Sequence, residues 1–82
     1  MMASGERYHK HGLFCAHRTL PFGTRLRIVN KKNGKTVEVV VKDRGPFSKG
    51  RLVDLSNKAA EVLDMLRDGV VPVEIWKMKN EE

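Results

Sequence analysis

Apolar and polar residues alternate most clearly in the middle of the chain, on either side of Asn33-Gly34. Two segments, Arg25 to Asn30 and Thr36 to Lys42, show the period of two that is typical of a half-buried strand. Asn-Gly tolerates the positive φ angles of a tight hairpin turn. The pattern therefore predicts a β-hairpin, whose inward positions are Leu26, Ile28, Asn30, Val37, Val39 and Val41.

The pattern changes after the hairpin. Leu52 to Leu55 is a short apolar run that predicts a buried strand, although it contains Asp54. Ser56 can cap a helix that ends at Gly69, and an apolar stripe at helical spacing follows it. Val70 to Met78 predicts a last strand, whose Pro72 favours a sheet edge or a bulge. The expected helix stripe consists of Ala59, Val62, Leu63 and Leu66.

Size and composition limit the possibilities. At 82 residues the chain has room for one small core, so we expect residues 1–82 to form one domain. Cys15 is the only cysteine, which excludes an internal disulfide, and the sequence contains neither an apolar leader nor an apolar run long enough to cross a membrane. The formal net charge of +6 fits a polyanionic partner, which could be nucleic acid, an anionic membrane surface or an anionic cell-wall polymer. It fits a merely solvated surface as well.

The second strand of the hairpin leads into a stiff loop, Arg44-Gly-Pro-Phe47, and Asp43 stands at the junction. A carboxyl group held at a strand end can be partly buried, which suits it to donate a proton. Taken alone, however, the residues favour a turn-forming aspartate that accepts backbone hydrogen bonds. We expect Asp54 to be structural, bonded to backbone or to Arg51. Arg44 could bind a sugar acid or bridge to a carboxylate.

Three motifs resemble the rare lipoprotein A family: Cys15-Ala-His-Arg-Thr-Leu-Pro-Phe-Gly-Thr24, Val41-Lys-Asp-Arg-Gly-Pro-Phe47 and Gly50-Arg-Leu-Val-Asp-Leu-Ser56. The resemblance runs from Ala3 to about Ile75. It implies a mainly β fold, a double-psi β-barrel of roughly six strands with one short helix, related to expansins. It also implies an exported protein of the cell envelope, in the periplasm or associated with the outer membrane.

Members of that family studied as enzymes are lytic transglycosylases, which cut peptidoglycan glycan strands that lack stem peptides. The resemblance implies a catalytic set of Asp43, Glu6 and His17, with Arg44 and Tyr8 as residues that bind substrate. Each of the three catalytic candidates also has a structural alternative. Asp43 could be a turn aspartate, Glu6 an exposed charge near a terminus, and His17 a histidine that ties neighbouring loops together. Tyr8 and Trp76 could stack on sugar rings or simply pack.

The sequence departs from the family pattern in several places. Only five residues precede Glu6, where the family has a segment resembling Ala-Ser-Trp-Tyr-Gly, so the first strand of the barrel is expected to be absent. Leu13-Phe-Cys-Ala-His17 stands where Leu-Thr-Ala-Ala-His is usual. Lys42 replaces an asparagine before Asp43, and His9 replaces a common aspartate. These differences bear on activity more than on fold.

Three functional hypotheses follow. The leading one is an enzyme that cleaves peptidoglycan glycan without water, and its rival is a non-catalytic, expansin-like carbohydrate-binding or cell-wall-binding module. A nucleic-acid binder fits the charge but lacks a known reading motif. The spacing of His9, His11, Cys15 and His17 matches no zinc signature, so we expect no metal and no cofactor. We expect a monomer.

Overall fold

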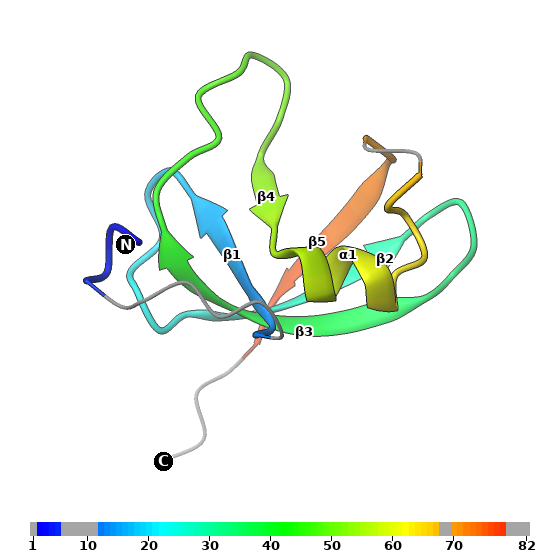
Figure 1. The fold of residues 1–82 in the computed structure, drawn as a ribbon, viewed down its shortest axis with the longest axis horizontal. Helices are drawn as coiled ribbons and strands as arrows, with labels where there is room; N and C mark the ends of the chain where they lie inside the picture. The colour runs from blue at the N-terminus through cyan, green and yellow to red at the C-terminus, as the bar shows by residue number, and fades with distance from the viewer. Residues whose placement is uncertain (1, 6–11, 68–69, 79–82) are drawn as a thin grey trace.

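The computed structural model describes residues 2–5, 12–67 and 70–78. Within these ranges the chain forms five strands and one helix, and the strands join in one curled sheet (Figure 1). The elements in chain order are β1 (Phe14–His17), β2 (Arg25–Asn30), β3 (Thr36–Asp43), β4 (Val53–Leu55), α1 (Asn57–Val62) and β5 (Val73–Lys77). No helix in the described ranges is long and apolar enough to cross a membrane.

The sheet is built around the predicted hairpin. β2 and β3 pair antiparallel, with Ile28 opposite Val37, and the turn between them contains Asn33-Gly34. β1 pairs parallel with the other side of β3, while β4 and β5 are antiparallel to β1 and β2. The resulting order, β4-β1-β3-β2-β5, makes β4 and β5 the two edges of the sheet. The mainly β expectation is confirmed.

One face of the curled sheet holds the core. The six positions predicted to point inward from β2 and β3 are all buried, which confirms the hairpin register. Cys15 of β1 joins them, and the helical segment covers the same face. The side chains that complete the core cluster are Ala59, Leu63 and Met65.

The helix is shorter than its pattern predicted. Ser56 is the N-cap, as expected, and its hydroxyl oxygen accepts a hydrogen bond from the Ala59 N–H. Ala59 and Leu63 are buried, but the other two stripe positions, Val62 and Leu66, are 41% and 56% exposed. Leu66 is exposed because the chain leaves the helix early: Asp64 has a φ of 55°, so the residues after it do not continue the helical face. Val62 is the last residue of α1, but its side chain is not part of the core cluster.

The last two strands also differ from the sequence pattern. Residues 52–55 were expected to be buried, yet Leu52 is 67% exposed and β4 is only half-buried. Because β4 lies at an edge of the sheet, neighbours cover it on one side only. β5 begins at Val73, after Pro72, and its edge position confirms the expectation drawn from that proline.

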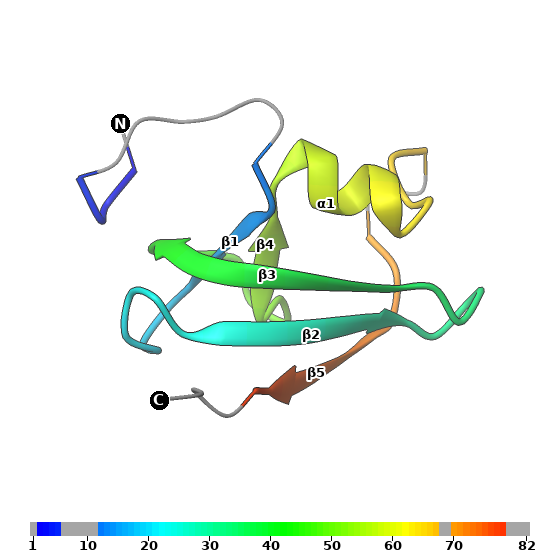
Figure 2. The same cartoon turned by 90° about the horizontal axis from the view of Figure 1, so that it is seen from below.

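The molecule has two different ends (Figure 2). At one, which we call the hairpin end, the turn at residues 30–35 lies beside residues 63 and 64 at the end of α1. At the other, the site end, the C-terminal residues of β1 and β3 lie with residues 2–5 and the loops 18–24 and 44–48. The site end holds the predicted functional residues that the structure describes.

Candidate active site

A β-bulge places Asp43 at the site end. Cys15 pairs with Val41, but the next residue of β1, Ala16, pairs with Asp43, so Lys42 is skipped. Bulges re-aim side chains and are common beside active sites. His17 follows Ala16 at the end of the same strand. The parallel pairing of β1 and β3 therefore brings two predicted site residues to the same end of adjacent strands (Figure 1).

Asp43 is half-buried and held by the backbone. Its Oδ1 accepts hydrogen bonds from the Ala3 N–H at 2.8 Å and the Arg44 N–H at 2.9 Å. The Ser4 N–H also donates to the Lys42 carbonyl at 3.1 Å. The segment just before Glu6 is thus tied to the end of β3. Glu6 and Tyr8 themselves lie outside the described residues.

The His17 ring is fixed through one nitrogen. Its Nδ1 accepts hydrogen bonds from the Thr19 and Leu20 N–H groups, both at 3.2 Å. In a neutral imidazole one nitrogen accepts and the other carries the proton, so the proton is on Nε2. The ring therefore holds the loop that directly follows it and also presents an N–H donor, whereas the structural alternative expected it to tie separate loops together.

Arg44 braces this loop against β3. Its Nη1 donates to the Leu20 carbonyl at 2.9 Å and the His17 carbonyl at 3.3 Å. Its Cζ lies 3.9 Å from the centroid of the Phe22 ring, a cation–π contact. The carboxylate bridge considered from the sequence goes to a different arginine, because Asp54 pairs with Arg51. That pairing was expected.

A second arginine makes the reciprocal brace. Arg18 Nε donates to the Pro46 carbonyl at 2.6 Å and its Nη2 to the Ser48 carbonyl at 2.8 Å. Arg18 from the first loop and Arg44 from the second thus hold each other's loops. Sequence reasoning missed Arg18, because only the folded arrangement shows where its guanidinium reaches. The Gly45–Pro46 peptide bond in this loop is cis.

Asp43 borders a small open depression of about 250 Å³. Asp54, from the strand on the far side of β1, borders it too. A larger groove of about 610 Å³ lies between β4, α1 and the segment before β5, and its lining is mainly apolar. We place the site at the smaller depression, because Asp43 lies there. Its lining residues are Phe14, Ala16, Asp43, Asp54, Leu55, Ser56 and Asn57.

Cys15 belongs to the core and not to this depression. It is completely buried, and burial raises the pKa of its thiol from 9.0 to about 12. A thiol with that pKa is protonated at neutral pH and is a poor nucleophile and metal ligand. Of the four residues considered for zinc, His9 and His11 lie outside the described residues.

Comparison with known proteins agrees with this geometry. A family model described as lytic transglycolase matches residues 1–75. A probable endolytic peptidoglycan transglycosylase RlpA from Aquifex aeolicus is 56% identical over 72 residues, covering 88% of this chain and 32% of the relative. The protein of that name from Nostoc sp. is 53% identical over 73 residues, or 89% of this chain and 20% of the relative.

A third relative, the endolytic peptidoglycan transglycosylase RlpA of Rickettsia felis, is 43% identical over 79 residues, covering 96% of this chain and 35% of the relative. The chain therefore spans a fifth to about a third of the length of these relatives. The family match covers most of the chain and includes β1, β3 and the two loops that Arg18 and Arg44 hold together. The chain belongs to the lytic transglycolase family of double-psi β-barrel domains, whose members include RlpA.

Proposed function

We propose that residues 1–82 form a single domain that cleaves the glycan strands of peptidoglycan as a lytic transglycosylase. One observation carries the proposal: Asp43 stands half-buried at the tip of β3, on the edge of an open depression and beside the end of β1 where His17 lies. The names of the relatives specify peptidoglycan as their substrate. Asp43, Glu6 and His17 form the proposed catalytic set, with Arg44 and Tyr8 binding substrate.

The proposed reaction needs one proton donor. Asp43 donates a proton to the glycosidic oxygen, and the bond to the anomeric carbon breaks as that oxygen keeps the electron pair. A hydroxyl of the same sugar then attacks the anomeric carbon and returns its proton to Asp43. The product is an anhydro sugar end, and water takes no part. The protonated Asp43 carboxyl group is restored, so a single residue serves as acid and then as base.

His17 and Arg44 assist in this proposal. His17 carries its proton on Nε2, so it donates a hydrogen bond to a sugar oxygen or to a carboxylate. Arg44 uses Nη1 for the loop carbonyls, and its other N–H groups form no hydrogen bond with a described residue, so they could bind an anionic or hydroxyl group of the glycan. A chain of net charge +6 also suits an anionic wall polymer.

A non-catalytic, expansin-like wall-binding module is the second candidate. The observation that favours it is the pair of backbone hydrogen bonds on Asp43 Oδ1, which is what a purely structural turn aspartate makes. Under either proposal the domain works at the peptidoglycan of the cell envelope. We propose that it does so as a monomer and without a cofactor.

One assay separates the two candidates. The purified chain is incubated with peptide-free glycan strands, and the products are examined by mass spectrometry for anhydro sugar ends. A pull-down with insoluble peptidoglycan is run in parallel. We expect anhydro ends to accumulate with time; retained pull-down without such ends would leave the binding module as the function. Reducing ends formed by uptake of water would instead indicate a hydrolase.

A further inference from the structure

The outer face of the curled sheet, which is directed away from the core, carries an exposed aromatic side chain. Leu26 and Ile28 of β2 point into the core, so the residues that alternate with them point outward. In β5, Ile75 packs against the core, and the next residue, Trp76, is 60% exposed. The indole of Trp76 therefore lies on the outer face, where β3, β2 and β5 run side by side (Figure 2).

An exposed arginine lies beside this indole. Arg27 of β2 pairs directly with Trp76, so the two side chains project from the same face with their Cβ atoms about 5 Å apart. Among the residues that the structure describes, the Arg27 guanidinium forms no hydrogen bond or ion pair. The cation–π contact found in the same part of the chain joins Arg44 to Phe22, so Arg27 does not cover the indole. Both the guanidinium and the indole face are open to a ligand.

The neighbouring charges leave Arg27 as the anion-binding group of this face. On its other side Arg27 pairs with Glu38, whose carboxylate oxygen lies 3.9 Å from Nη2 of Arg25. Arg25 therefore offsets the charge of Glu38. Glu74 is on the outer face as well, two residues before Trp76 on β5. A row across three strands thus presents a paired carboxylate, an unpaired guanidinium and an indole.

This row has the chemistry to bind a sugar that carries a carboxylate. The C–H groups on one face of a pyranose ring pack against the face of an aromatic ring, which is negatively charged. A guanidinium binds a carboxylate through two parallel hydrogen bonds. In a peptide-free glycan strand of peptidoglycan, every second sugar has a free carboxylate, because no stem peptide converts it to an amide. Charge and shape therefore both match such a strand.

We propose that Trp76 and Arg27 form a second glycan-binding site, which holds an acidic sugar of a peptide-free strand on the outer face of the sheet. This inference rests on the proposed peptidoglycan-directed function. Trp76 packs on the ring and Arg27 binds the carboxylate, and no bond is made or broken there. The described residues that line the depression beside Asp43 come instead from β1, the end of β3, β4 and the start of α1. Two separate contacts raise the avidity of the domain for the wall.

The emission of Trp76 measures binding at this site directly, because the chain has one tryptophan. Peptide-free glycan fragments are titrated into the Asp43→Asn variant, which leaves them uncut. Chitin fragments of equal length, which lack the carboxylate, are the neutral control. We expect a saturable change in emission with the glycan and about tenfold weaker binding of chitin, because charge-assisted hydrogen bonds are lost. An unchanged emission with the glycan, or equal binding of the two polymers, would overturn the proposal.

Two arginine variants separate a local contact from the net charge. In the same titration, Arg27→Gln should weaken binding of the glycan about tenfold and change that of chitin less than about twofold. Arg67→Gln is the matched control: it removes the same charge from an exposed residue that follows α1, and it should bind like the starting protein. An equal loss in both variants would reduce the effect to net charge and overturn the proposal.

The aromatic ring is tested by retention on insoluble peptide-free peptidoglycan, with thermal unfolding as the check on folding. Trp76→Leu keeps an apolar side chain but loses the flat ring, so we expect retention to weaken about tenfold, whereas Trp76→Tyr should stay within about threefold. Full retention of a folded Trp76→Leu would overturn the proposal, as would sedimentation that shows a dimer closed by Trp76. If Trp76→Leu does not fold, the arginine variants decide. A normal Trp76 response without anhydro ends from the unmodified chain would instead refute the proposed cleavage alone.

Discussion

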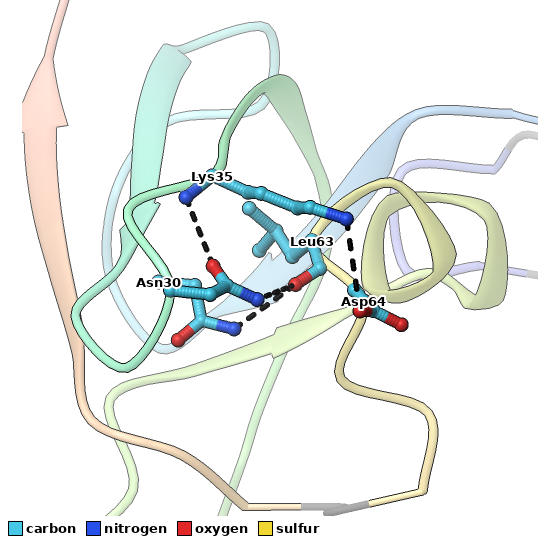
Figure 3. A network of polar contacts seen from close by, with 5 residues as sticks. Asn30, Lys35, Leu63 and Asp64 are labelled. Atoms are coloured by element: carbon cyan, nitrogen blue, oxygen red, sulfur yellow. Dashed lines mark hydrogen bonds and ion pairs between the residues drawn. The ribbon is translucent and has the colours of Figure 1, made fainter.

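The hairpin end and the site end both contain polar side chains, but the protein uses them differently. At the hairpin end the Leu63 carbonyl accepts hydrogen bonds from the side-chain amides of Asn30 and Asn33, both at 3.0 Å (Figure 3). The Oδ1 atoms of the same two asparagines accept from backbone N–H groups of the turn, those of Lys32 and Lys35. Both polar atoms of each asparagine side chain, Oδ1 and Nδ2, therefore help to hold the turn against the end of α1.

At the site end each candidate side chain is only half used. Within the described ranges, hydrogen bonds reach Asp43 through Oδ1 and His17 through Nδ1. Asp43 Oδ2 and His17 Nε2 are therefore oriented by the fold but engaged by no described residue. At the site end, one polar atom of each side chain fixes its position and the second polar atom can contact a ligand. At the hairpin end, both polar atoms of each asparagine side chain are used to hold the turn.

Asp43→Asn should have the largest effect. It should abolish a function of the site end while leaving the stability of the fold nearly unchanged. The amide oxygen of asparagine can still accept both backbone N–H bonds, so the free energy of unfolding should change by less than about 1 kcal/mol. The proton donor is lost, however, and general acid–base catalysis contributes about 10² to 10⁴-fold to rate. We expect anhydro-end formation to fall about 1,000-fold while peptidoglycan pull-down persists. Unchanged activity would remove Asp43 from the mechanism.

Asn30→Ala should have the opposite profile. Asn30 is completely buried, and its loss removes one donor to the Leu63 carbonyl and the acceptor for the Lys32 N–H. We expect a loss of about 2 to 3 kcal/mol in the free energy of unfolding, measured by urea denaturation. Asn33→Ala, at an exposed position, is the control and should cost about 1 kcal/mol. Activity per folded molecule should be unchanged; a specific loss of activity would mean that the two ends are coupled.

The sequence was sufficient for the hairpin end and only partly for the site end. Strict alternation and Asn33-Gly34 specify the β2–β3 register locally, and the structure agrees residue by residue. The helix stripe failed at Leu66 because the chain leaves the helix at Asp64, where no glycine or proline signals a stop. It also failed at Val62, which lies within α1 but is exposed. The half-burial of β4 depends on its place at a sheet edge, which is a property of the topology.

The candidate site depended on contacts between segments far apart in the chain. Asp43 could be singled out because it ends an alternating strand before a Gly-Pro loop. The bulge that sets it opposite Ala16 has no local signature, since Val41 and Asp43 fit an unbroken alternation equally well. The reciprocal braces of Arg18 and Arg44 join loops 24 to 30 residues apart in the chain. The roles of Glu6 and Tyr8 stay predictions.

The titration of Cys15 shows whether the core extends to the edge of the site, because Cys15 lies only two residues before His17. Its folded pKa of about 12 lies above the ordinary value of 9.0. The raised pKa therefore contributes stability that is fully present below pH 9 and is lost as the pH rises from 9 towards 12. Relative to Cys15→Ala, which lacks this titration, the unmodified chain should lose about 1.4 kcal/mol between pH 7 and pH 10.

Urea denaturation at both pH values measures this difference, and the subtraction removes the titration of lysine and tyrosine. Thiol labelling with a chromogenic disulfide at pH 8 gives an independent check, because a buried, protonated thiol should react only after unfolding. Rapid labelling of the folded chain would show that β1 opens at Cys15, so that Cys15 would not belong to the stable core.

Asp64→Gly should have the smallest effect, a slight increase in the free energy of unfolding that comes from the hairpin end. Asp64 occupies the left-handed position after the helix, with a φ of 55°. The Met65 N–H donates to the Ala60 carbonyl and the Asp64 N–H to the Glu61 carbonyl, the two hydrogen bonds of a Schellman motif. Glycine adopts this conformation without the strain that a side chain adds, although it also loses more freedom on folding.

The substitution also removes an ion pair, in which Lys35 Nζ lies 3.6 Å from Asp64 Oδ2 (Figure 3). Both side chains are more than half exposed, so the pair should contribute less than about 0.5 kcal/mol. We expect Asp64→Gly to raise the free energy of unfolding by about 0.5 kcal/mol, or the Tm by about 2 to 4 °C, and Lys35→Ala to change it by less than that. Since neither residue contributes to the site end, glycan cleavage should be the same in both variants. A net destabilisation by Asp64→Gly that Lys35→Ala reproduces would show that the ion pair, and not the asparagine network, holds the turn to the helix.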